Sequence, residues 1–265
     1  MPDDNDRKQK EITGFSTGAN PTGRVLISIL FDKALRFFLK RSQREDPVDR
    51  AVDYKTSAKD VIEACGVPHP EVDLILVDGQ SVRFGYQIRA DSRVEVFPYS
   101  PGHDPASRLQ ERGIEAFVAD GHLGKLARDL RLLGIDVLYD NTAADRDLLM
   151  IIRMTGRALL SRDRRLLMHG AIKNGFFPRS QQPLEQTVEV IRRFELSSKL
   201  APFTRCLRCN GILNPAPKES VLGRLQPLTK LYYNDFSQCS LCGQTYWRGS
   251  HIEKLQKRVR ALCNQ

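Results

Sequence analysis

Acidic side chains repeatedly follow apolar segments in the middle of this 265-residue chain. Three of these acids stand at or just beyond the ends of predicted strands, and two open a predicted helix. In a parallel sheet whose strands are joined by crossover helices, strand ends and helix beginnings share one edge. We therefore expect carboxylates to converge at that edge, drawn from Asp120, Asp140, Asp145, Asp147 and Asp163.

Carboxylates that are brought together repel one another, so a cluster of them is costly unless cations neutralise it. An all-oxygen ligand set suits Mg²⁺ or Mn²⁺, and two such ions about 3.5–4 Å apart form the usual clamp for phosphodiester cleavage. One ion would lower the pKa of a bound water, and the other would stabilise the leaving oxygen. The alternative is that these residues are helix caps and turn residues, positions at which Asp is common.

A second group of chemically competent residues lies near the C-terminus. Cys206 and Cys209 form one CxxC pair, Cys239 and Cys242 form another, and 29 residues separate the pairs. Four thiolates at this spacing predict a closed, structural Zn²⁺ site, which holds a fold together and has no open position for catalysis. Free buried thiols or an iron–sulfur centre are the alternatives.

Alternating strand and helix patterns would position the acids. Short apolar runs predict strands, and longer segments with apolar residues at helical spacing predict the helices between them. Gly134 is expected to end the first helix, and Pro183 to begin the last one. The predicted strands are 114–119, 135–139, 158–161 and 176–178, and the predicted helices are 123–133, one that opens at 145–147, and 183–195.

Several blocks of this region resemble a known family. Residues 117–120 read FVAD, followed by LGKLAR, LRLLG, DRDLL and LSRDR, and then by the cysteine pairs. From residue 114 to its end the chain resembles the PIN-like RNase domain of the Mut-7 C-terminal family. The resemblance implies a PIN-like α/β fold and metal-dependent ribonuclease activity, with Asp120 and Asp163 matching the acids after the first and third strands. The middle acid stays open among Asp140, Asp145 and Asp147.

The N-terminal part shows strand, helix and strand patterns across about 75 residues, which predict a small β-grasp fold. Asp78-Gly79 is a strong tight-turn signal within it. This part resembles the ubiquitin-like domain that often precedes the RNase domain. Sulfur-carrier chemistry is excluded, because a carrier needs a free Gly-Gly terminus and this domain continues into a linker. We expect it to position RNA or to bind a protein or ribosome partner, and we regard Cys65 and His69 as incidental.

These patterns divide the chain into five parts. Residues 1–22 are polar and are expected to be disordered. The ubiquitin-like β-grasp domain covers 23–99, a Pro- and Gly-containing linker covers 100–112, the PIN-like domain covers 113–200, and a zinc ribbon with a basic tail covers 201–265. The overall prediction is an α/β protein in which a PIN-like parallel sheet with flanking helices lies between a β-grasp domain and a four-cysteine ribbon.

Basic and aromatic residues near these sites are candidates for RNA contacts. On the helix after Asp120, cations are placed to approach a phosphate or to balance the acids structurally. Those beside Asp163 would hold an RNA backbone or form a solvated turn. In the ribbon, aromatics among cations suit base stacking, although a small ribbon also needs aromatics for its core. The candidates are Lys125, Arg128, Arg162, Arg164, Trp247 and Arg248.

Charge and composition narrow the class of protein. The net charge is +9, and residues 201–265 hold 10 Lys and Arg against 3 Asp and Glu, which favours a polyanionic partner such as RNA. No apolar run is long enough to span a bilayer, and the N-terminus lacks the features of a secretory signal. Cysteines in CxxC pairs suit a reducing compartment, so we expect a cytoplasmic protein.

Two functional hypotheses follow. The first is a ribonuclease that uses Mg²⁺ or Mn²⁺ for catalysis and Zn²⁺ for structure, with the ribbon assisting RNA binding. The second is a non-catalytic RNA- or ribosome-binding protein that retains the PIN-like scaffold, since a fold alone does not determine activity.

Overall fold

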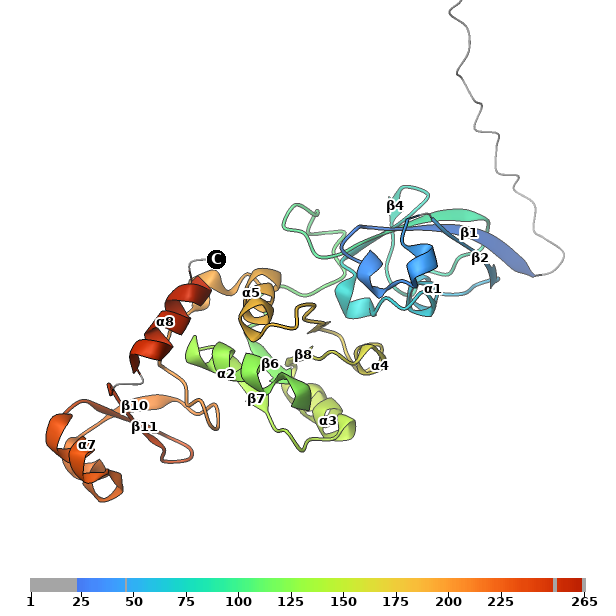
Figure 1. The fold of residues 1–265 in the computed structure, drawn as a ribbon. Coiled ribbons are helices and arrows are strands. Elements are labelled where there is room, and N and C mark those ends of the chain that lie inside the picture. Colours follow the sequence, from blue (N-terminus) through green and yellow to red (C-terminus); the bar gives the residue numbers. More distant parts are fainter. Residues whose placement is uncertain (1–22, 46, 250–251, 264–265) are drawn as a thin grey trace, which may run out of the picture.

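The structure, a computed structural model, describes residues 23–45, 47–249 and 252–263. The segment 1–22, which was predicted to be disordered, lies outside the described residues. Figure 1 shows three parts in a row: an N-terminal sheet, a central parallel sheet with its helices, and a C-terminal module that carries the cysteines. The fold class is mixed α/β, as predicted.

The N-terminal part is a β-grasp-like sheet of order β2-β1-β5-β3-β4, in which only the central pair β1–β5 is parallel. Ser57 caps its helix by accepting a hydrogen bond from Asp60 N, as the sequence predicts. Asp78 and Gly79 both have positive φ, 49° and 81°, which confirms the tight turn between β3 and β4. The elements are β1 (Arg24–Phe31), η1 (Arg36–Phe38), η2 (Arg41–Gln43), β2 (Val48–Asp53), α1 (Ala58–Ala64), η3 (His69–Glu71), β3 (Leu74–Val77), β4 (Gln80–Ser81) and β5 (Ser92–Phe97).

The central part is a four-stranded parallel sheet of order β7-β6-β8-β9. Successive residues of β6 face opposite layers: Val118 joins the apolar core that includes residues of α3, and Phe117 joins the one that includes residues of α2 and α5. The elements are β6 (Ala116–Ala119), η4 (Gly121–Leu123), α2 (Gly124–Leu132), β7 (Asp136–Tyr139), α3 (Asp145–Thr155), β8 (Ala158–Leu160), α4 (Arg164–Leu167), β9 (Gly175–Phe176), α5 (Pro183–Arg193) and η5 (Leu196–Lys199).

The N-terminal and central parts share one hydrophobic core. The rings of Phe38 and Phe177 meet edge to face, with centroids 5.4 Å apart. Glu71 accepts a hydrogen bond from Phe177 N at 2.6 Å and pairs with Arg179, although it is almost fully buried. His69, expected to be incidental, is buried between Glu63 and the carbonyl of Ile172. These polar contacts fix the N-terminal sheet against the central part.

The predicted linker also has a defined structure. Gln110 is buried and donates to the carbonyls of His69 and Val72 at 3.1 and 2.8 Å, and Leu109 N donates to Asp73 O. The chain therefore crosses from one part to the other while packed on the N-terminal sheet.

The C-terminal module is a three-stranded antiparallel sheet, β10 (Leu213–Ala216), β11 (Phe236–Cys239) and β12 (Thr245–Trp247). The insertion between the cysteine pairs forms α6 (Lys218–Val221), η6 (Leu222–Arg224) and α7 (Pro227–Tyr232). The tail that was predicted only as basic is a helix, α8 (Ile252–Cys263), which returns to the central part and pairs Arg258 with Asp129 on α2. No helix among the described residues combines the length and apolar content that crossing a bilayer requires.

Candidate functional site

The three adjacent strands β7, β6 and β8 end side by side, and an acid follows each of them. The last residue of β6 is aligned with the last residues of both β7 and β8. Asp120 directly follows β6, Asp140 directly follows β7, and Asp163 follows β8 after two further residues. We call this carboxyl end of the sheet the acidic edge.

Ser161 links two of these acids. Its hydroxyl donates to Asp120 Oδ2 at 2.7 Å and accepts from the backbone N–H of Asp163 at 2.9 Å. Ser161 is fully buried, whereas Asp120 is half-buried and Asp163 is exposed. The hydroxyl therefore fixes the loop after β8 relative to the end of β6. Within the described residues, Asp120 Oδ1 and Asp163 Oδ2 have no protein hydrogen-bond partner.

Asp163 is also a helix cap. Its Oδ1 accepts from the backbone N–H groups of Arg165 and Leu166, at 2.7 and 3.2 Å, and begins α4. Capping thus uses one carboxylate oxygen and leaves the other. Among the described residues, no basic side chain forms an ion pair with Asp120 or Asp163.

The middle acids, Asp140, Asp145 and Asp147, differ in the hydrogen bonds that their carboxylates accept. Asp140 accepts hydrogen bonds from the backbone N–H and then the hydroxyl of Thr142, at 2.8 and 2.7 Å, which hold the pKa of its carboxyl below the usual range. Asp147 Oδ2 accepts from Ala144 N at 3.2 Å and caps the first turn of α3. Asp145 is exposed and makes no hydrogen bond or ion pair with a described residue.

Gly124 belongs to the block LGKLAR, on which the family resemblance rests, and its lack of a side chain has a structural role. A Cβ added at Gly124 would lie 2.6 Å from Tyr139 Oη, so a larger residue there would require the Tyr139 ring to shift. The same hydroxyl donates to Gly121 O at 2.9 Å. The start of α2 at Gly124 places Lys125 and Arg128 on the exposed face of α2, where their side chains have no partner among the described residues.

The basic residues beside Asp163 are engaged by the protein. Arg162 donates to Gln181 Oε1 at 2.7 Å, and its guanidinium lies 5.7 Å from the ring centroid of Phe177. Arg164 donates to the carbonyl of Phe38 at 2.8 Å and lies 5.2 Å from that ring. The loop that carries Asp163 therefore contacts the N-terminal sheet directly.

The opposite, amino end of the sheet receives the cysteine module. Asp136 opens β7 and forms a two-point ion pair with Arg157, at 2.6 and 3.1 Å. Asn210 donates to the same carboxylate at 2.7 Å and accepts from Val137 N. Burial would raise the pKa of Asp136, but the hydrogen bonds from Arg157 and Asn210 outweigh burial and hold it below the usual range. A four-residue strand, about 13 Å at 3.3 Å per residue, separates this contact from the acidic edge.

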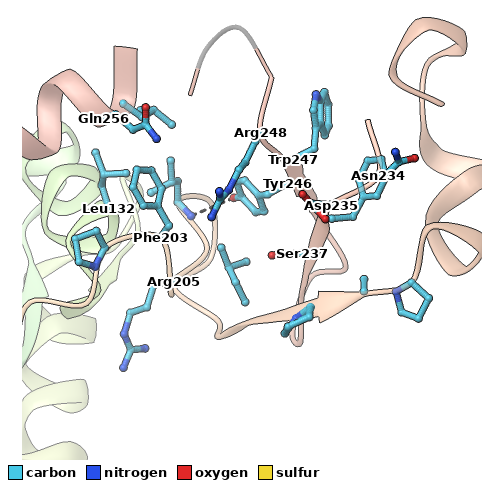
Figure 2. Close-up of a pocket in the computed structure, with 18 residues that line it drawn as sticks. Leu132, Phe203, Arg205, Asn234, Asp235, Ser237, Tyr246, Trp247, Arg248 and Gln256 are labelled. Carbon is cyan, nitrogen blue, oxygen red and sulfur yellow. Dashed lines mark hydrogen bonds between the residues drawn. The ribbon is translucent and has the colours of Figure 1, made fainter. Parts of the chain in front are cut away.

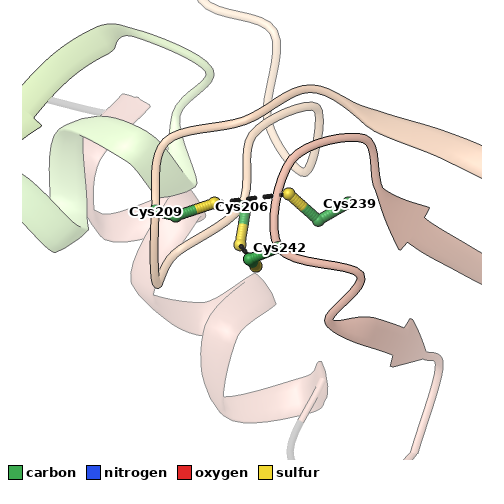
Figure 3. Close-up of side chains that lie close together, drawn as sticks. All are labelled: Cys206, Cys209, Cys239 and Cys242. Carbon is green, nitrogen blue, oxygen red and sulfur yellow. Dashed lines mark hydrogen bonds between the residues drawn. The ribbon is translucent and has the colours of Figure 1, made fainter.

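The four cysteines converge on one point (Figure 3). Their sulfur atoms lie within 4.8 Å of one another, and the Sγ–Sγ distances are 3.7 Å for Cys206–Cys242 and 3.4 Å for Cys209–Cys239. A tetrahedral Zn²⁺ with bonds of about 2.3 Å would place its sulfurs about 3.8 Å apart. Among the described residues, this is the one group of three or more metal-ligating side chains so closely gathered. The cluster could therefore hold a metal such as zinc.

Electrostatics within the cluster also suits a cation. Burial would raise the pKa of Cys206, but hydrogen bonds from the Tyr246 hydroxyl and from backbone N–H groups lower it to about 6. Burial and the adjacent thiols raise the pKa of Cys209 to about 12. Neighbouring thiols thus oppose ionisation of Cys209, and binding of a cation to the cluster would favour the thiolate and release a proton.

A cavity of about 970 Å³ lies between the cysteine module, α2 and α8. Figure 2 shows Arg248 directed towards Tyr246 and Phe203 along its wall. Trp247 also lines it, but packs against the module's own small core around Phe236. Of the predicted pair, Arg248 therefore lies along the cavity as a cation, and Trp247 is a partly buried aromatic.

The fold and these two sites define a class: an α/β protein with acids at the carboxyl edge of a parallel sheet, a β-grasp-like domain before it and a four-cysteine module after it. Residues 115–259 match the family model described as Mut7-C RNAse domain, and residues 24–104 match the one described as Mut7-C ubiquitin. The chain belongs to the Mut7-C RNAse domain family, which supports a ribonuclease-type function in general. No curated protein matched the chain.

Sequence reasoning missed two features of the site. Ser161 was not singled out, although its position between a buried strand and Asp163 was a usable signal. The contact of Phe38 with Arg164 joins residues 126 positions apart and had no local signal.

Proposed function

We propose that the chain is a metal-dependent ribonuclease that hydrolyses RNA phosphodiester bonds at the acidic edge. The observation that carries this proposal is the pair Asp120 and Asp163, joined through Ser161, with one oxygen of each carboxylate lacking a partner among the described residues. Membership of the Mut7-C RNAse domain family supports the choice of RNA as substrate.

Carboxylate oxygens are the donors that a hard divalent cation prefers. Among the described residues, only the four cysteines lie close enough to one another to form a group of three or more metal ligands before an ion binds. Asp120 and Asp163 would bind a divalent cation through oxygen, with Asp145 or Asp147 completing the set from the start of α3. Bound Mg²⁺ or Mn²⁺ would supply an activated water and stabilise charge on the leaving oxygen. The protein's part would be to orient these carboxylates: the buried Ser161 hydroxyl donates to the Asp120 carboxylate and accepts from the backbone N–H of Asp163.

Basic side chains around the edge would hold the RNA. Lys125 and Arg128 are exposed on the helix after Asp120 and are available for phosphates. Arg162 and Arg164 each use some of their N–H groups in hydrogen bonds within the protein, but a guanidinium has five N–H groups. We propose that their remaining donors contact the backbone beside the scissile phosphate.

We propose that the cysteine module holds a structural Zn²⁺ through Cys206, Cys209, Cys239 and Cys242, and that it assists RNA binding through Trp247 and Arg248. Because the module is attached at the amino end of the sheet, it would contact RNA at a distance from the cleaved bond. We propose that the ubiquitin-like domain also binds a protein or ribosome partner. Thiolate ligands suit a reducing compartment such as the cytoplasm.

A non-catalytic RNA-binding role is the second candidate, because Asp163 and Asp147 both serve as helix caps. Such caps need no metal.

One experiment separates the two functions. Single-stranded and structured RNA are incubated with Mn²⁺ or Mg²⁺ and with wild type, Asp120→Asn, Asp163→Asn or the double variant. Asn caps helices about as well as Asp, so Asp163→Asn should keep the start of α4 while losing the charge. Glu115→Gln is the control, since Glu115 is an exposed acid just before β6, at the other end of the same strand.

We expect cleavage by wild type and by Glu115→Gln, and a loss of at least about 100-fold in each Asn variant, because a charged ligand is removed. If the wild type and all variants bind RNA but none of them cleaves it, the non-catalytic role would be established instead.

A further inference from the structure

The loop after β1, residues 32–47, contains five cations and three acids, and the three acids stand at its two ends. Residues 33–44, which we call the basic segment, include η1 and η2 and contain no acid. Two of its cations, Arg36 and Arg44, shape the loop by donating to backbone carbonyls. The five cations of the basic segment are Lys33, Arg36, Lys40, Arg41 and Arg44.

The basic segment adjoins the acidic edge. Phe37 and Phe38, at its centre, both lie under the guanidinium of Arg164, with ring centroids 5.6 and 5.2 Å away. Arg164 is the residue after Asp163, and it donates to Phe38 O. In Figure 1 the N-terminal sheet lies on the α4 side of the central part. The cysteine module, by contrast, is attached at the amino end of the sheet. Of these two accessory parts, the N-terminal one therefore adjoins the acids.

Most of the charge of the basic segment is available. Arg36 donates to Phe31 O and Arg44 O, both at 3.0 Å, and so shapes the loop. Lys33, Lys40 and Arg41 are exposed, and no hydrogen bond or ion pair joins their side chains to a described residue. Arg165, exposed on α4, is likewise without a side-chain partner in the described part of the chain and extends the positive surface towards Asp163.

Positive charge is dense where the two domains meet. Burial lowers the pKa of Arg164, and the nearby charge of Arg44 lowers it further. Like charges that the fold brings together repel one another, and a bound polyanion would relieve that repulsion. Phe37, 38% exposed, adds an aromatic surface among these cations. Exposed aromatics beside cations are how proteins bind unpaired nucleotides, since bases stack on the ring and phosphates meet the charges.

We propose that the basic segment and Arg165 form a binding surface for single-stranded RNA that leads into the acidic edge. The inference rests on the proposed ribonuclease function and deepens it: the ubiquitin-like domain is part of the substrate-binding site. Phosphates contact Lys40, Arg41 and Arg165, and an unpaired base stacks on Phe37.

The test removes three charges near the acids and compares this with removing three charges far from them. The first variant is Lys40→Gln/Arg41→Gln/Arg165→Gln. The control is Arg24→Gln/Lys55→Gln/Arg89→Gln, which loses the same net charge at the other end of β1, roughly 20 Å away by strand rise. All six side chains are exposed, so both variants should fold.

Binding of a fluorescent single-stranded RNA is measured in the Asp120→Asn background without divalent ions, over a range of salt concentrations. Cleavage is measured separately with Asp120 restored. We expect the first variant to bind about 10- to 100-fold more weakly, with its log–log salt slope lowered by about 2, because each lost phosphate contact removes about 0.7. The control should bind like wild type. Phe37→Leu should weaken binding about tenfold at every salt concentration, because stacking is lost while apolar bulk is kept.

The outcomes separate this inference from the function on which it rests. If wild type cleaves RNA and the first variant binds and cleaves like the control, the basic segment is not the binding surface and the ribonuclease proposal stands. If no form cleaves but the first variant alone loses binding, the surface stands and the catalytic proposal fails. Equal weakening of both triple variants would also overturn the inference, since it would show a general effect of net charge.

Discussion

At the scale of single residues, the acids of the acidic edge make structural hydrogen bonds with one carboxylate oxygen and leave the other without a described protein partner. Asp163 gives one oxygen to the backbone of α4 and keeps the other. Asp120 gives one oxygen to Ser161 in the same way. Each carboxylate is thus oriented by the protein before any cation arrives. Such preorganisation is what a catalytic ligand needs and what a simple cap does not require.

Ser161→Ala tests whether this orientation matters. The variant removes a buried hydroxyl that serves both acids, so we expect a loss of about 1 kcal/mol in the free energy of unfolding. We also expect a fall of about tenfold or more in kcat, since the Asp120 carboxylate loses the hydrogen bond that orients it and the Asp163 backbone loses its anchor. Denaturant unfolding and RNA cleavage kinetics give the two values. A stability loss with kcat unchanged would mean that Ser161 only supports the fold.

At the scale of elements, close backbone approaches decide where the helices begin and end. Gly134 ends α2 with φ of +86°, which suits glycine. A Cβ at this position would also collide with Ala201 O and with Thr204 Oγ1. Gly134 therefore ends α2 and also lets the segment around Ala201 and Thr204, which leads into the cysteine module, approach closely.

Gly134→Ala should cost more than a left-handed backbone conformation alone. Gly156, which ends α3 with φ of +68°, provides the matched comparison, because a Cβ there meets nothing within 4 Å. We expect Gly156→Ala to lower the free energy of unfolding by about 1–2 kcal/mol. Gly134→Ala should exceed this by at least about 1 kcal/mol because of the clash. Equal losses in thermal or urea unfolding would show that the two chain segments move apart easily.

At the scale of the whole molecule, the central domain has an accessory part at each end of its sheet. The ubiquitin-like domain shares the core on one side and adjoins the acids. The cysteine module is attached at the amino end through Asn210 and Arg205, and α8 returns to pack Leu262 into the central core. Disrupting the cysteine cluster should therefore also lower the stability of the central domain.

Metal analysis of the purified protein should find one zinc per chain. A zinc-selective chelator, with Mg²⁺ kept constant, should lower the thermal midpoint, because metal binding supplies folding free energy to a small module. Cys209→Ser should behave like the chelated protein. Cys65→Ser is the control, since Cys65 is buried in the ubiquitin-like domain, away from the cluster. Iron in place of zinc, or a midpoint insensitive to the chelator, would contradict the assignment.

The sequence by itself determined the local elements and the sites that depend on short spacing. The tight turn at Asp78-Gly79, the cap at Ser57 and the parallel strands followed by acids were all readable, because each depends on neighbouring residues. The cysteine cluster was predictable for the same reason, since each CxxC pair encodes half of a tetrahedral site.

Only the tertiary structure decided which accessory part adjoins the acids. Strand periodicity gives the side on which a residue lies but not which distant chain segment covers it. The contacts of Phe38 with Arg164, and of Asn210 with Asp136, join residues more than 70 positions apart. The helix at the C-terminus was not predicted, although Ile252, Leu255, Val259 and Leu262 recur at helical spacing. What the sequence does not record is that Val259 and Leu262 pack on the central domain. Such pairings are set by packing between surfaces, which no local pattern records.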